Sequence, residues 1–478
     1  MMAALPEAMK NTYSVCPVCL ERLLARRKMR EDGIYLVRTC PRHGTFSSLI
    51  WRNRVDFAAW RGERPAVGAE ENRNCPSGCG LCPDHLRATC CTLLEITDRC
   101  NMDCAFCFAD PAARPDPPLE EIRRRIRELT DPGKTLLQLS GGEPTVREDL
   151  PEIVACAREA GCKYVQLNSN GLRLAQEEAF VKKLADAGLS FVFLQFDGVT
   201  DAVYETLRKR PLLEIKKRAI ENCGRFGIGV TLVPVLVPGV NTDQIGEIIR
   251  FAAARSPYVR GVHFQPVSYF GRIPRLPRDE DRYTLDELME AVVSQSGGLV
   301  KMENLAPSGC DHPLCGFHGD FIVMPDGSLM ALTSRKAEQA FACRDARNPA
   351  EQNREFVGRR WGRRDVRPVK EAGAGSDPAG AGAAAAGTGA DLAGQTGAGS
   401  SAAEYGDMTS MEFFLKRARS HGFTVTAMAF QDAGNLDIER LRQCSLHVYR
   451  DGKKIPFCAC YLTPMGENAD AARGGENG

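Results

Sequence analysis

Three cysteines in one short segment have the spacing of an iron–sulfur cluster site. Cys100, Cys104 and Cys107 form a CxxxCxxC pattern directly after an apolar, strand-like segment. Cysteine thiolates ligate the irons of a 4Fe–4S cluster, and three of them leave the fourth iron open to an exchangeable ligand. We therefore expect these three residues to hold a catalytic cluster.

A second motif supports this expectation. Gly141-Gly142-Glu143-Pro144 follows the next strand-like segment, although an ordinary turn into a helix would also explain it. With Phe106 beside the last cysteine, the two motifs resemble the radical S-adenosylmethionine (SAM) superfamily. The resemblance implies that SAM chelates the open iron, that an electron from the cluster cleaves its C–S bond, and that the GGEP motif contacts the methionine amino group. The glycines would let the backbone approach SAM, and Glu143 would accept from its ammonium group.

Polar residues end other strand-like segments, where parallel sheets place ligand-binding groups. We expect them to contact the ribose hydroxyls or the methionine carboxylate, and capping of turns is the alternative for each. They are Asn168, Ser169, Asn170, Gln195 and Asp197. His263 and Gln265, on a later strand, are candidate substrate contacts, with a core histidine as the alternative for His263.

The N-terminal cysteines predict further metal centres. Cys16-Pro17-Val18-Cys19, Cys40-Pro41-Arg42-His43 and Cys79-Gly80-Leu81-Cys82 contain the knuckles typical of zinc, rubredoxin-like iron or clusters. The expected ligands are Cys16, Cys19, Cys40, Cys75, Cys79, Cys82 and Cys90, with Cys91 adjacent. Spacing does not divide them among individual metals. Because the core of this module is small, it needs metal to fold.

A C-terminal group of cysteines lies on both sides of a low-complexity segment. Its members are Cys310, Cys315, Cys343, Cys444, Cys458 and Cys460, with His312, His318 and His447 nearby. We expect an auxiliary 4Fe–4S cluster here, ligated by Cys310, Cys315, Cys444 and Cys458; zinc or unliganded thiols are the alternatives. The remaining cysteines, predicted to be packed small residues, are Cys156, Cys162 and Cys223.

Alternating strand-like and helix-like segments must position these groups. The predicted strands are 93–97, 136–139, 164–167, 191–196, 230–237 and 261–266, and the predicted helices between them are 119–129, 150–160, 175–187, 212–226 and 242–254. Six β–α repeats predict a parallel sheet with right-handed crossovers. The fold class is therefore α/β, a partial (βα)6 barrel flanked by cysteine-rich N-terminal and C-terminal modules.

Composition predicts the domain boundaries. We expect a metal-binding module at 1–90, the barrel at 91–300, a cluster module made of 301–370 and 404–464, a disordered insertion at 371–403 and a disordered tail at 465–478. The insertion consists almost entirely of Gly, Ala, Ser, Thr, Asp and Gln, which cannot form a core.

Charge and hydropathy exclude some classes of protein. The 62 basic and 61 acidic residues give a net charge of +1, which argues against general affinity for nucleic acid. No apolar run reaches the ~18 residues of a membrane helix, and no signal peptide precedes the first cysteines. We expect a cytoplasmic protein, with transient contact at the inner face of the membrane as an option. In that compartment, 20 clustered cysteines favour metal sites over disulfides.

Longer stretches resemble the archaeal tetraether lipid synthases and their uncharacterised bacterial relatives over residues 11–345 and 410–464. The matching segments are Cys16–Cys19, Thr39–Gly44, Cys79–His85, Cys100–Phe108, Asp311–Cys315, Cys444–His447 and Ile455–Cys458. This resemblance implies a radical cluster, two further clusters, a rubredoxin-like iron, and C–C bond formation between lipid chains. The long Gly/Ala insertion departs from that family.

Three functions are compatible with these features. The first is a radical enzyme that abstracts hydrogen from an inert carbon of a lipid. The second is a radical methylase or cofactor-modifying enzyme that acts on a pterin-like small molecule. The third is a non-catalytic electron-transfer protein, against which the Glu143 motif argues. A wide apolar pocket would favour the first over the second. Either enzyme needs an electron donor of the ferredoxin or flavodoxin type.

Deleting residues 375–400 should leave iron content and SAM cleavage unchanged. Leu392 is the only large apolar residue in the insertion, so little is lost from any core. Each doubling of a loop costs only about 0.6 kcal/mol in closure entropy. Iron analysis and the yield of 5′-deoxyadenosine test this prediction, and loss of iron would show that the insertion is structural.

Overall fold

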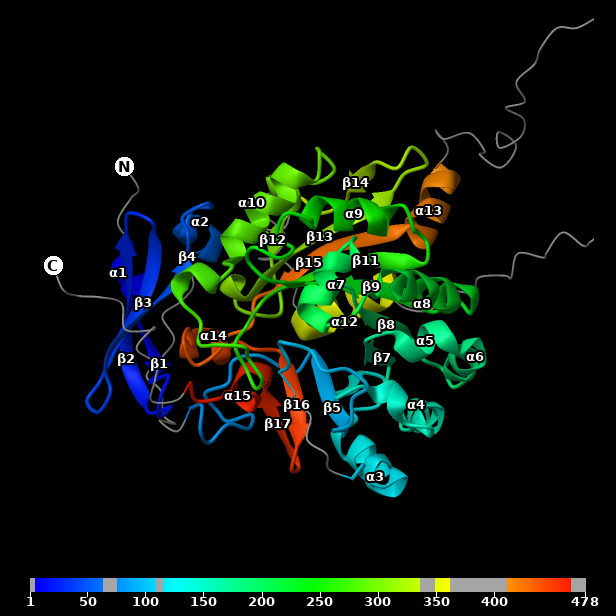
Figure 1. The fold of residues 1–478 in the computed structure, drawn as a ribbon, viewed down its shortest axis with the longest axis horizontal. Helices are drawn as coiled ribbons and strands as arrows, with labels where there is room; N and C mark the ends of the chain where they lie inside the picture. The colour runs from blue at the N-terminus through cyan, green and yellow to red at the C-terminus, as the bar shows by residue number, and fades with distance from the viewer. Residues whose placement is uncertain (1–4, 63–74, 109–114, 336–348, 362–410, 466–478) are drawn as a thin grey trace, which may run out of the picture.

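The computed structural model describes residues 5–62, 75–108, 115–335, 349–361 and 411–465. These residues form two β-sheets and the helices around them (Figure 1). The predicted insertion, Cys343 and nearly all of the predicted tail lie outside the described residues.

The N-terminal sheet is small and antiparallel. Its strands are β1 (Asn11–Val15), β2 (Arg22–Arg30), β3 (Gly33–Cys40) and β4 (Gly44–Trp51), in that spatial order. The helices α1 (Glu7–Lys10) and α2 (Phe57–Arg61) flank it. The turn at Pro41–His43 joins β3 to β4. Buried and exposed residues alternate along β2, as in a sheet with one face against a core.

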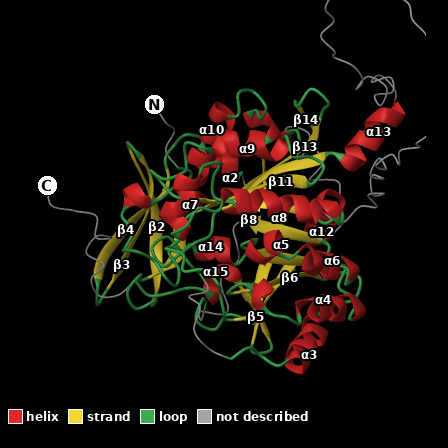
Figure 2. Cartoon of the chain, turned by 45° about the vertical axis from the view of Figure 1, so that its right-hand side comes forward, coloured by secondary structure: helices red, strands yellow, loops and turns green. Residues whose placement is uncertain are grey.

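The larger sheet contains six adjacent parallel strands, as predicted. They are β5 (Cys91–Thr97), β6 (Leu136–Gly141), β7 (Tyr164–Ser169), β8 (Phe191–Gln195), β9 (Gly229–Val233) and β11 (Val259–Pro266). Helices cover the outer face (Figures 1 and 2). They are α3 (Leu119–Leu129), α4 (Leu150–Glu159), α5 (Leu172–Gln176), α6 (Glu178–Asp186), α7 (Asp201–Arg208), α8 (Leu213–Arg225) and α9 (Ile245–Ala253), with α10 (Leu285–Gln295) beside α9. The predicted α/β partial barrel is confirmed.

Two predicted elements are interrupted in the structure. The strand expected at 230–237 is divided into β9 and β10 (Val235–Leu236) at Pro234, which has no N–H to donate to a neighbouring strand. The helix expected at 175–187 is divided into α5 and α6 at Glu177, whose φ of −123° and ψ of 84° are not helical. Neither break moves the ends of the strands that carry candidate site residues.

Segments from the C-terminal half extend the larger sheet at both edges. On one side, β15 (Gly422–Met428) pairs parallel with β11, and β13 (Gly316–Val323) pairs antiparallel with β15. On the other side, β16 (Leu446–Arg450) pairs parallel with β5. The other elements of this half are β12 (Ala306–Pro307), β14 (Leu329–Ala331), β17 (Lys453–Pro456), α12 (Pro349–Trp361), α13 (Met411–Ser420), α14 (Ile438–Leu441), α15 (Phe457–Cys460), and the 3-10 helices Asp279–Asp281, Met302–Asn304 and Pro313–Cys315. The C-terminal segments therefore share one sheet with the barrel.

Helix α12 closes one end of the inner face, the face of the larger sheet turned away from α3–α9. The Trp361 indole donates to Thr424 Oγ1 at 2.9 Å, and its ring lies 5.0 Å from that of Phe193. Gly229, at the start of β9, is required there because a Cβ would lie 2.6 Å from the Trp361 carbonyl oxygen. The inner face is thus covered near the amino ends of the strands.

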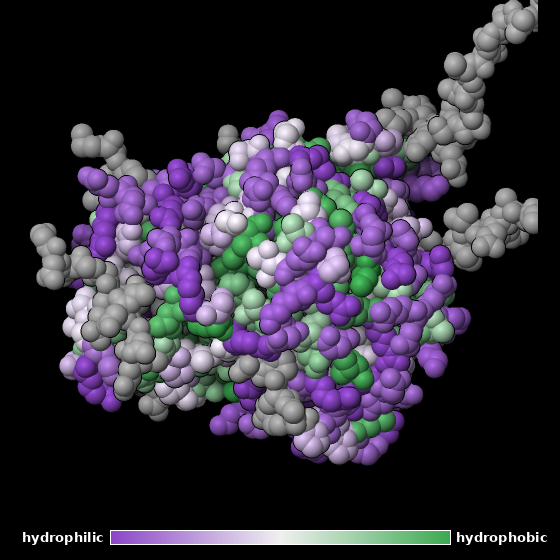
Figure 3. Space-filling model, viewed as in Figure 1, coloured by the Kyte–Doolittle hydropathy of each residue, from purple (hydrophilic) through white to green (hydrophobic). Residues whose placement is uncertain are grey.

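In the ranges that the structure describes, no helix combines the length and hydropathy needed to cross a membrane. The face drawn in Figure 3 is mostly hydrophilic, with hydrophobic residues gathered toward its middle.

A buried ion-pair network joins the N-terminal sheet to the C-terminal half. Arg27 on β2 has a fully buried side chain, and its guanidinium lies 2.6 Å from carboxylate oxygens of both Asp437 and Glu439. Asp437 also accepts from Thr12 Oγ1 at 2.7 Å, and Glu439 pairs with Arg61. Because these charges are removed from water, they must stay paired.

Replacing Asp437 with Ala should destabilise the protein by about 3 kcal/mol or more, because a buried guanidinium loses its main partner. Thermal denaturation of the metal-loaded protein measures the change. Glu7→Ala, which breaks an exposed pair with Lys10, is the matched control and should leave the melting temperature unchanged. Equal melting temperatures for the two variants would show that the network does not hold the two parts together.

Candidate active site and metal centres

The predicted cluster cysteines lie together on the loop after β5. Cys107 exchanges backbone hydrogen bonds with Arg272, at 3.1 and 3.0 Å, which anchors the end of the loop. Burial raises the pKa of the Cys100 thiol to about 11, and the negative charges of Glu143, Cys104 and Cys107 act in the same direction. Cys104 and Cys107 are thus near enough to Cys100 to act on its charge, as cysteines that share one cluster must be.

A buried cation lies beside this loop. Arg208 forms two hydrogen bonds with Asp197, at 2.7 and 2.8 Å, and both side chains are almost completely buried. Burial opposes the charge of Arg208, but Asp197 and Cys104 together raise the pKa of the guanidinium. Arg208 thus places a buried guanidinium next to Cys104. The donor set therefore fits a cluster.

The glycines of the GGEP motif allow a close approach of two backbones. A Cβ on Gly141, where φ is +127°, would lie 2.1 Å from the Thr97 carbonyl oxygen, and one on Gly142 would lie 2.1 Å from that of Arg99. The Gly142 and Glu143 N–H groups donate to these two oxygens at 2.8 Å. The approach of these glycines to SAM stays a prediction. They let the turn pack against the start of the cluster loop.

Glu143 is 2% exposed and braces the ends of β6 and β7. One carboxylate oxygen accepts from Thr145 Oγ1 at 2.6 Å and Ser169 Oγ at 2.8 Å, and the other accepts from the Asn170 N–H at 2.6 Å. Burial raises the pKa of this carboxyl, and the hydrogen bonds oppose that shift. Pro144 begins the 3-10 helix Pro144–Val146 directly after it. The contact of Glu143 with SAM stays a prediction, and an ammonium would have to share oxygens that already accept from the protein.

Lys216 on α8 is a site residue that we did not predict. Its ammonium donates to the Asn170 carbonyl at 2.5 Å and to Gln195 Oε1 at 2.9 Å. Burial lowers the pKa of Lys216 to about 7, although Asp197 raises it. The sequence did carry a signal, because Lys216 occupies the buried stripe of α8 with Ala219, Ile220 and Cys223. A lysine in an apolar stripe indicates a buried partner.

The other predicted cofactor contacts fall into two places. Asn170, Gln195 and Asp197 lie beside the cluster loop, where Asn170 Nδ2 donates to Asn101 Oδ1 at 2.7 Å. Asn168 lies instead on the inner face, where it hydrogen-bonds Gln166 and Ser140. Phe106 on the loop is half-buried, with its ring 6.1 Å from that of Tyr269.

The N-terminal knuckles form a compact metal site. Ligand atoms of Cys16, Cys19, Cys40 and His43 all lie within 4.8 Å of one another. His43 Nδ1 is 3.6 Å from Cys16 Sγ and 3.4 Å from Cys40 Sγ. Burial raises the pKa of the Cys40 thiol, but hydrogen bonds from Arg42 and His43 outweigh it and lower the pKa to about 7. Three thiolates and one imidazole around a single point suit tetrahedral zinc.

The remaining cysteines are grouped differently from our expectation. The sulfurs of Cys75 and Cys79 lie 3.9 Å apart. The hydrogen bond to Cys75 and burial raise the pKa of Cys79 most, and the charges of Cys82 and Cys444 raise it further. Cys444, expected with the C-terminal set, thus also faces the N-terminal one. Its own pKa is raised first by burial and then by several charges, including that of Cys458.

Two smaller groups complete the set. Cys90, expected with the N-terminal ligands, instead hydrogen-bonds Cys310, and Asn353 Nδ2 lies 3.0 Å from its sulfur. Cys315 accepts from Arg440 Nε at 3.5 Å, and its charge acts on Cys458. Tertiary contacts therefore bring cysteines from both halves of the chain together, as an auxiliary cluster requires.

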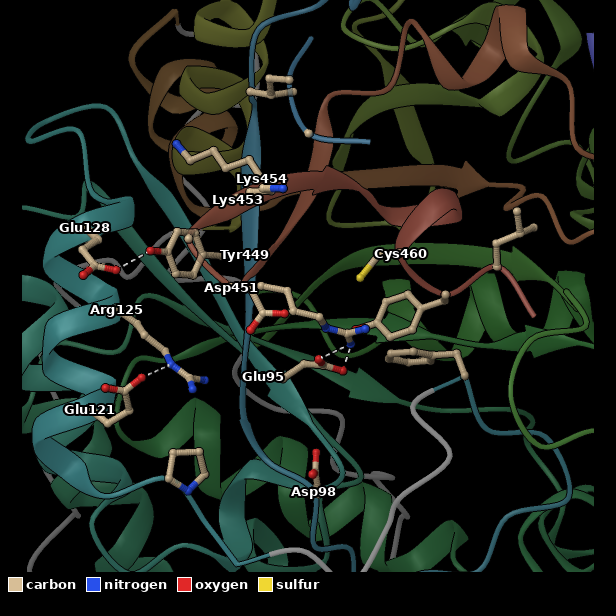
Figure 4. A pocket seen from close by; sticks show the side chains of 18 of the residues that line it. Glu95, Asp98, Glu121, Arg125, Glu128, Tyr449, Asp451, Lys453, Lys454 and Cys460 are labelled. Carbon is tan, nitrogen blue, oxygen red and sulfur yellow. Dashed lines mark hydrogen bonds and ion pairs between the residues drawn. The ribbon is translucent and has the colours of Figure 1, made fainter. Parts of the chain in front are cut away.

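A groove of about 1510 Å³ opens between the loop at Cys79–Cys82, α3, β5 and the β16–β17 hairpin (Figure 4). Its charges are largely paired with one another: Glu95 accepts from Arg450 at 2.6 Å and from the Tyr461 hydroxyl at 2.8 Å. Cys460 lines this groove, and burial raises the pKa of its thiol to about 11.

Comparison with known proteins places this site in a family. The model of the radical SAM superfamily matches residues 94–252. The chain is 32% identical to the 7,8-dihydro-6-hydroxymethylpterin dimethyltransferase of Methanocaldococcus jannaschii, over 94% of its own length and 92% of that protein. The chain belongs to the radical SAM superfamily. This radical SAM enzyme uses a 4Fe–4S cluster and SAM, with additional metal sites.

Other matches cover parts of the radical SAM enzyme. The model of the HMPTM N-terminal zinc ribbon domain matches residues 8–52, which contain the Cys16–His43 site. The Fe-coproporphyrin III synthase of Methanosarcina barkeri is 36% identical over 41% of this chain and 48% of that protein. Among solved structures, SuiB of Streptococcus suis is 19% identical over 44% of this chain and 46% of that one, with a TM-score of 0.37.

Replacing Cys100, Cys104 and Cys107 together with Ala should abolish 5′-deoxyadenosine formation and remove about four irons per chain, because no cluster can then be held. Anaerobic iron and zinc analysis and chromatography of the products check this. The matched control is the Cys156/Cys162/Cys223 triple Ala variant, whose thiols are buried in the main core and should not bind metal. Retained SAM cleavage in the first variant would contradict the assignment.

Proposed function

We propose that this radical SAM enzyme methylates a pterin-like heterocycle. The Methanocaldococcus jannaschii relative, over almost the full chain, is by its name a dimethyltransferase of 7,8-dihydro-6-hydroxymethylpterin. The name agrees with the small-molecule alternative from the sequence better than with lipid C–C bond formation. A relative's name alone does not carry a substrate, so the proposal depends on the inner face of the sheet.

The polarity of that inner face is the observation that carries the proposal. Central strands of a parallel sheet are ordinarily apolar on both faces. On β6–β11, the outward residues such as Leu139, Leu167 and Leu194 follow this rule and pack under the helices. The alternate, inward positions are mixed, because Leu136, Phe191 and Phe193 are apolar and pack with α12. The polar ones are Gln138, Gln166, Asn168, Gln195, Thr231, His263 and Gln265.

Several of these inward side chains are half-buried although they lie in the middle of the sheet, among them Gln138, Asn168 and His263. Their side chains are therefore partly accessible on the inner face, above α12. Accessible amides and an imidazole suit a polar ring system better than an alkyl chain. His263, expected as a substrate contact, has its Nδ1 2.8 Å from Thr426 Oγ1.

The residues then divide the work between them. Cys100, Cys104 and Cys107 would hold the cluster, which together with SAM would supply the radical chemistry that removes hydrogen from carbon. Arg208 maintains positive charge beside the loop, and Lys216 holds the Asn170 carbonyl and the Gln195 amide in place. The inward polar side chains orient the substrate, and α12 excludes water from one end. A small ferredoxin or flavodoxin type protein supplies electrons in the cytoplasm, and the outer cysteines hold zinc and auxiliary clusters.

Anaerobic turnover tests the proposal. The reconstituted enzyme, SAM, a chemical reductant and 7,8-dihydro-6-hydroxymethylpterin should give 5′-deoxyadenosine and a pterin heavier by one or two methyl groups, detected by mass spectrometry. Because methylation needs a one-carbon source, two reactions are run side by side. The first contains SAM as the sole one-carbon source, and the second also contains a reduced folate-type compound. A parallel arm with a lipid extract should give no product. Methyl-free pterin in both arms, or a modified lipid, would overturn the proposal.

A further inference from the structure

We propose that Gln138, Gln166 and Asn168 form a hydrogen-bonded amide chain that selects the substrate by the polar edge of its ring, with Phe193 packing against the ring face. This inference rests on the proposed function, since it concerns the same space. It assigns specificity to residues that contact no part of the metal site. Only His263 and Gln265 were expected from the sequence to contact substrate.

The three amides are linked head to tail across β6 and β7. Gln138 and Gln166 are register partners, and Gln138 Nε2 donates to Gln166 Oε1 at 3.2 Å. Gln166 Nε2 donates to Asn168 Oδ1 at 2.8 Å, and Asn168 Nδ2 donates to Ser140 Oγ at 3.4 Å. Gln166, in the middle, is 1% exposed, whereas Gln138 and Asn168 are half-buried. Each end of the chain can therefore reach a ligand, and its centre is fixed.

A chain of this kind presents donors and acceptors together. A primary amide has one acceptor oxygen and two N–H donors, and only part of that capacity is used inside the chain. Paired amide groups of Asn and Gln recognise the adjacent donor and acceptor of a nucleobase edge in the same way. The matching substrate edge is a lactam carbonyl and ring N–H beside an amino-substituted ring carbon, as in a pterin or a guanine-like ring.

The neighbouring strand supplies a flat apolar surface. Phe193 is the register partner of Asn168 and is half-buried. Its ring lies 5.0 Å from that of Trp361 and 5.5 Å from that of His263. The planes of the Phe193 and His263 rings are inclined by 37°. These neighbours hold the phenyl ring in place while part of it stays accessible. A flat heterocycle bound at the amide chain would lie next to this ring.

Binding measurements with two rings test the inference. The probes are 7,8-dihydro-6-hydroxymethylpterin and its lumazine counterpart, in which an oxo group replaces the 2-amino group. The wild-type holoenzyme should bind the pterin at least tenfold more tightly than the lumazine in anaerobic equilibrium dialysis. Gln138→Met should bind the pterin about tenfold more weakly and lose the preference. A loss of discrimination is not expected from a merely structural defect.

A matched control separates specificity from folding. Gln176→Met changes the same residue type on the exposed end of α5 and should keep both the affinity and the preference. Unchanged iron content and circular dichroism in Gln138→Met show that the variant is folded; if it is not, Gln138→Glu takes its place. If the folded Gln138→Met variant keeps the affinity and the preference of the wild type, this inference is overturned, but the proposed function is not. Failure of the wild type to bind the pterin overturns the proposed function as well.

Discussion

The close packing of the GGEP turn on the cluster loop is the constraint on which the site depends. Only glycine fits at positions 141 and 142, because a Cβ at either would lie 2.1 Å from a carbonyl oxygen of the loop. The two backbone hydrogen bonds made there bring Glu143 under the loop, and Glu143 in turn fixes the end of β7 through Ser169 and Asn170. The loop, the motif and two strand ends thus form one connected unit.

Buried charge surrounds this unit and is paired almost everywhere. Asp197 and Arg208 neutralise each other at the end of β8, and Lys216 reaches the same place from α8. Such buried pairs rarely stabilise a protein more than apolar residues would. Here the pair places a guanidinium next to Cys104. The Arg27–Asp437–Glu439 network is also buried, but it pairs one base with two acids, and it joins the N-terminal sheet to the C-terminal half.

The two faces of the larger sheet perform separate tasks. The outward residues form the main apolar core with the helices, which supplies the burial that stabilises the fold. Several inward residues lie outside that core and are polar.

Local patterns determined the parts of this protein that depend on near neighbours in the chain. The CxxxCxxC and GGEP motifs indicated the cluster loop, and hydrophobic periodicity predicted α3 at the residues where it occurs and all six parallel strands. Pro234 and Glu177 interrupt elements that periodicity alone predicts as continuous, because the apolar pattern does not report a missing N–H or a non-helical φ.

Only the tertiary structure decided which distant residues meet. Cys444 faces Cys79 across more than 360 positions, Cys90 contacts Cys310, and β16 joins β5, and no periodicity contains such pairings. The same holds for the inner face. Alternation along each strand places Gln138 and Gln166 on one face, but it does not show that sheet register joins their side chains by a hydrogen bond. The reason is physical, since sequence patterns report local geometry, whereas these contacts depend on the order and register of strands far apart in the chain.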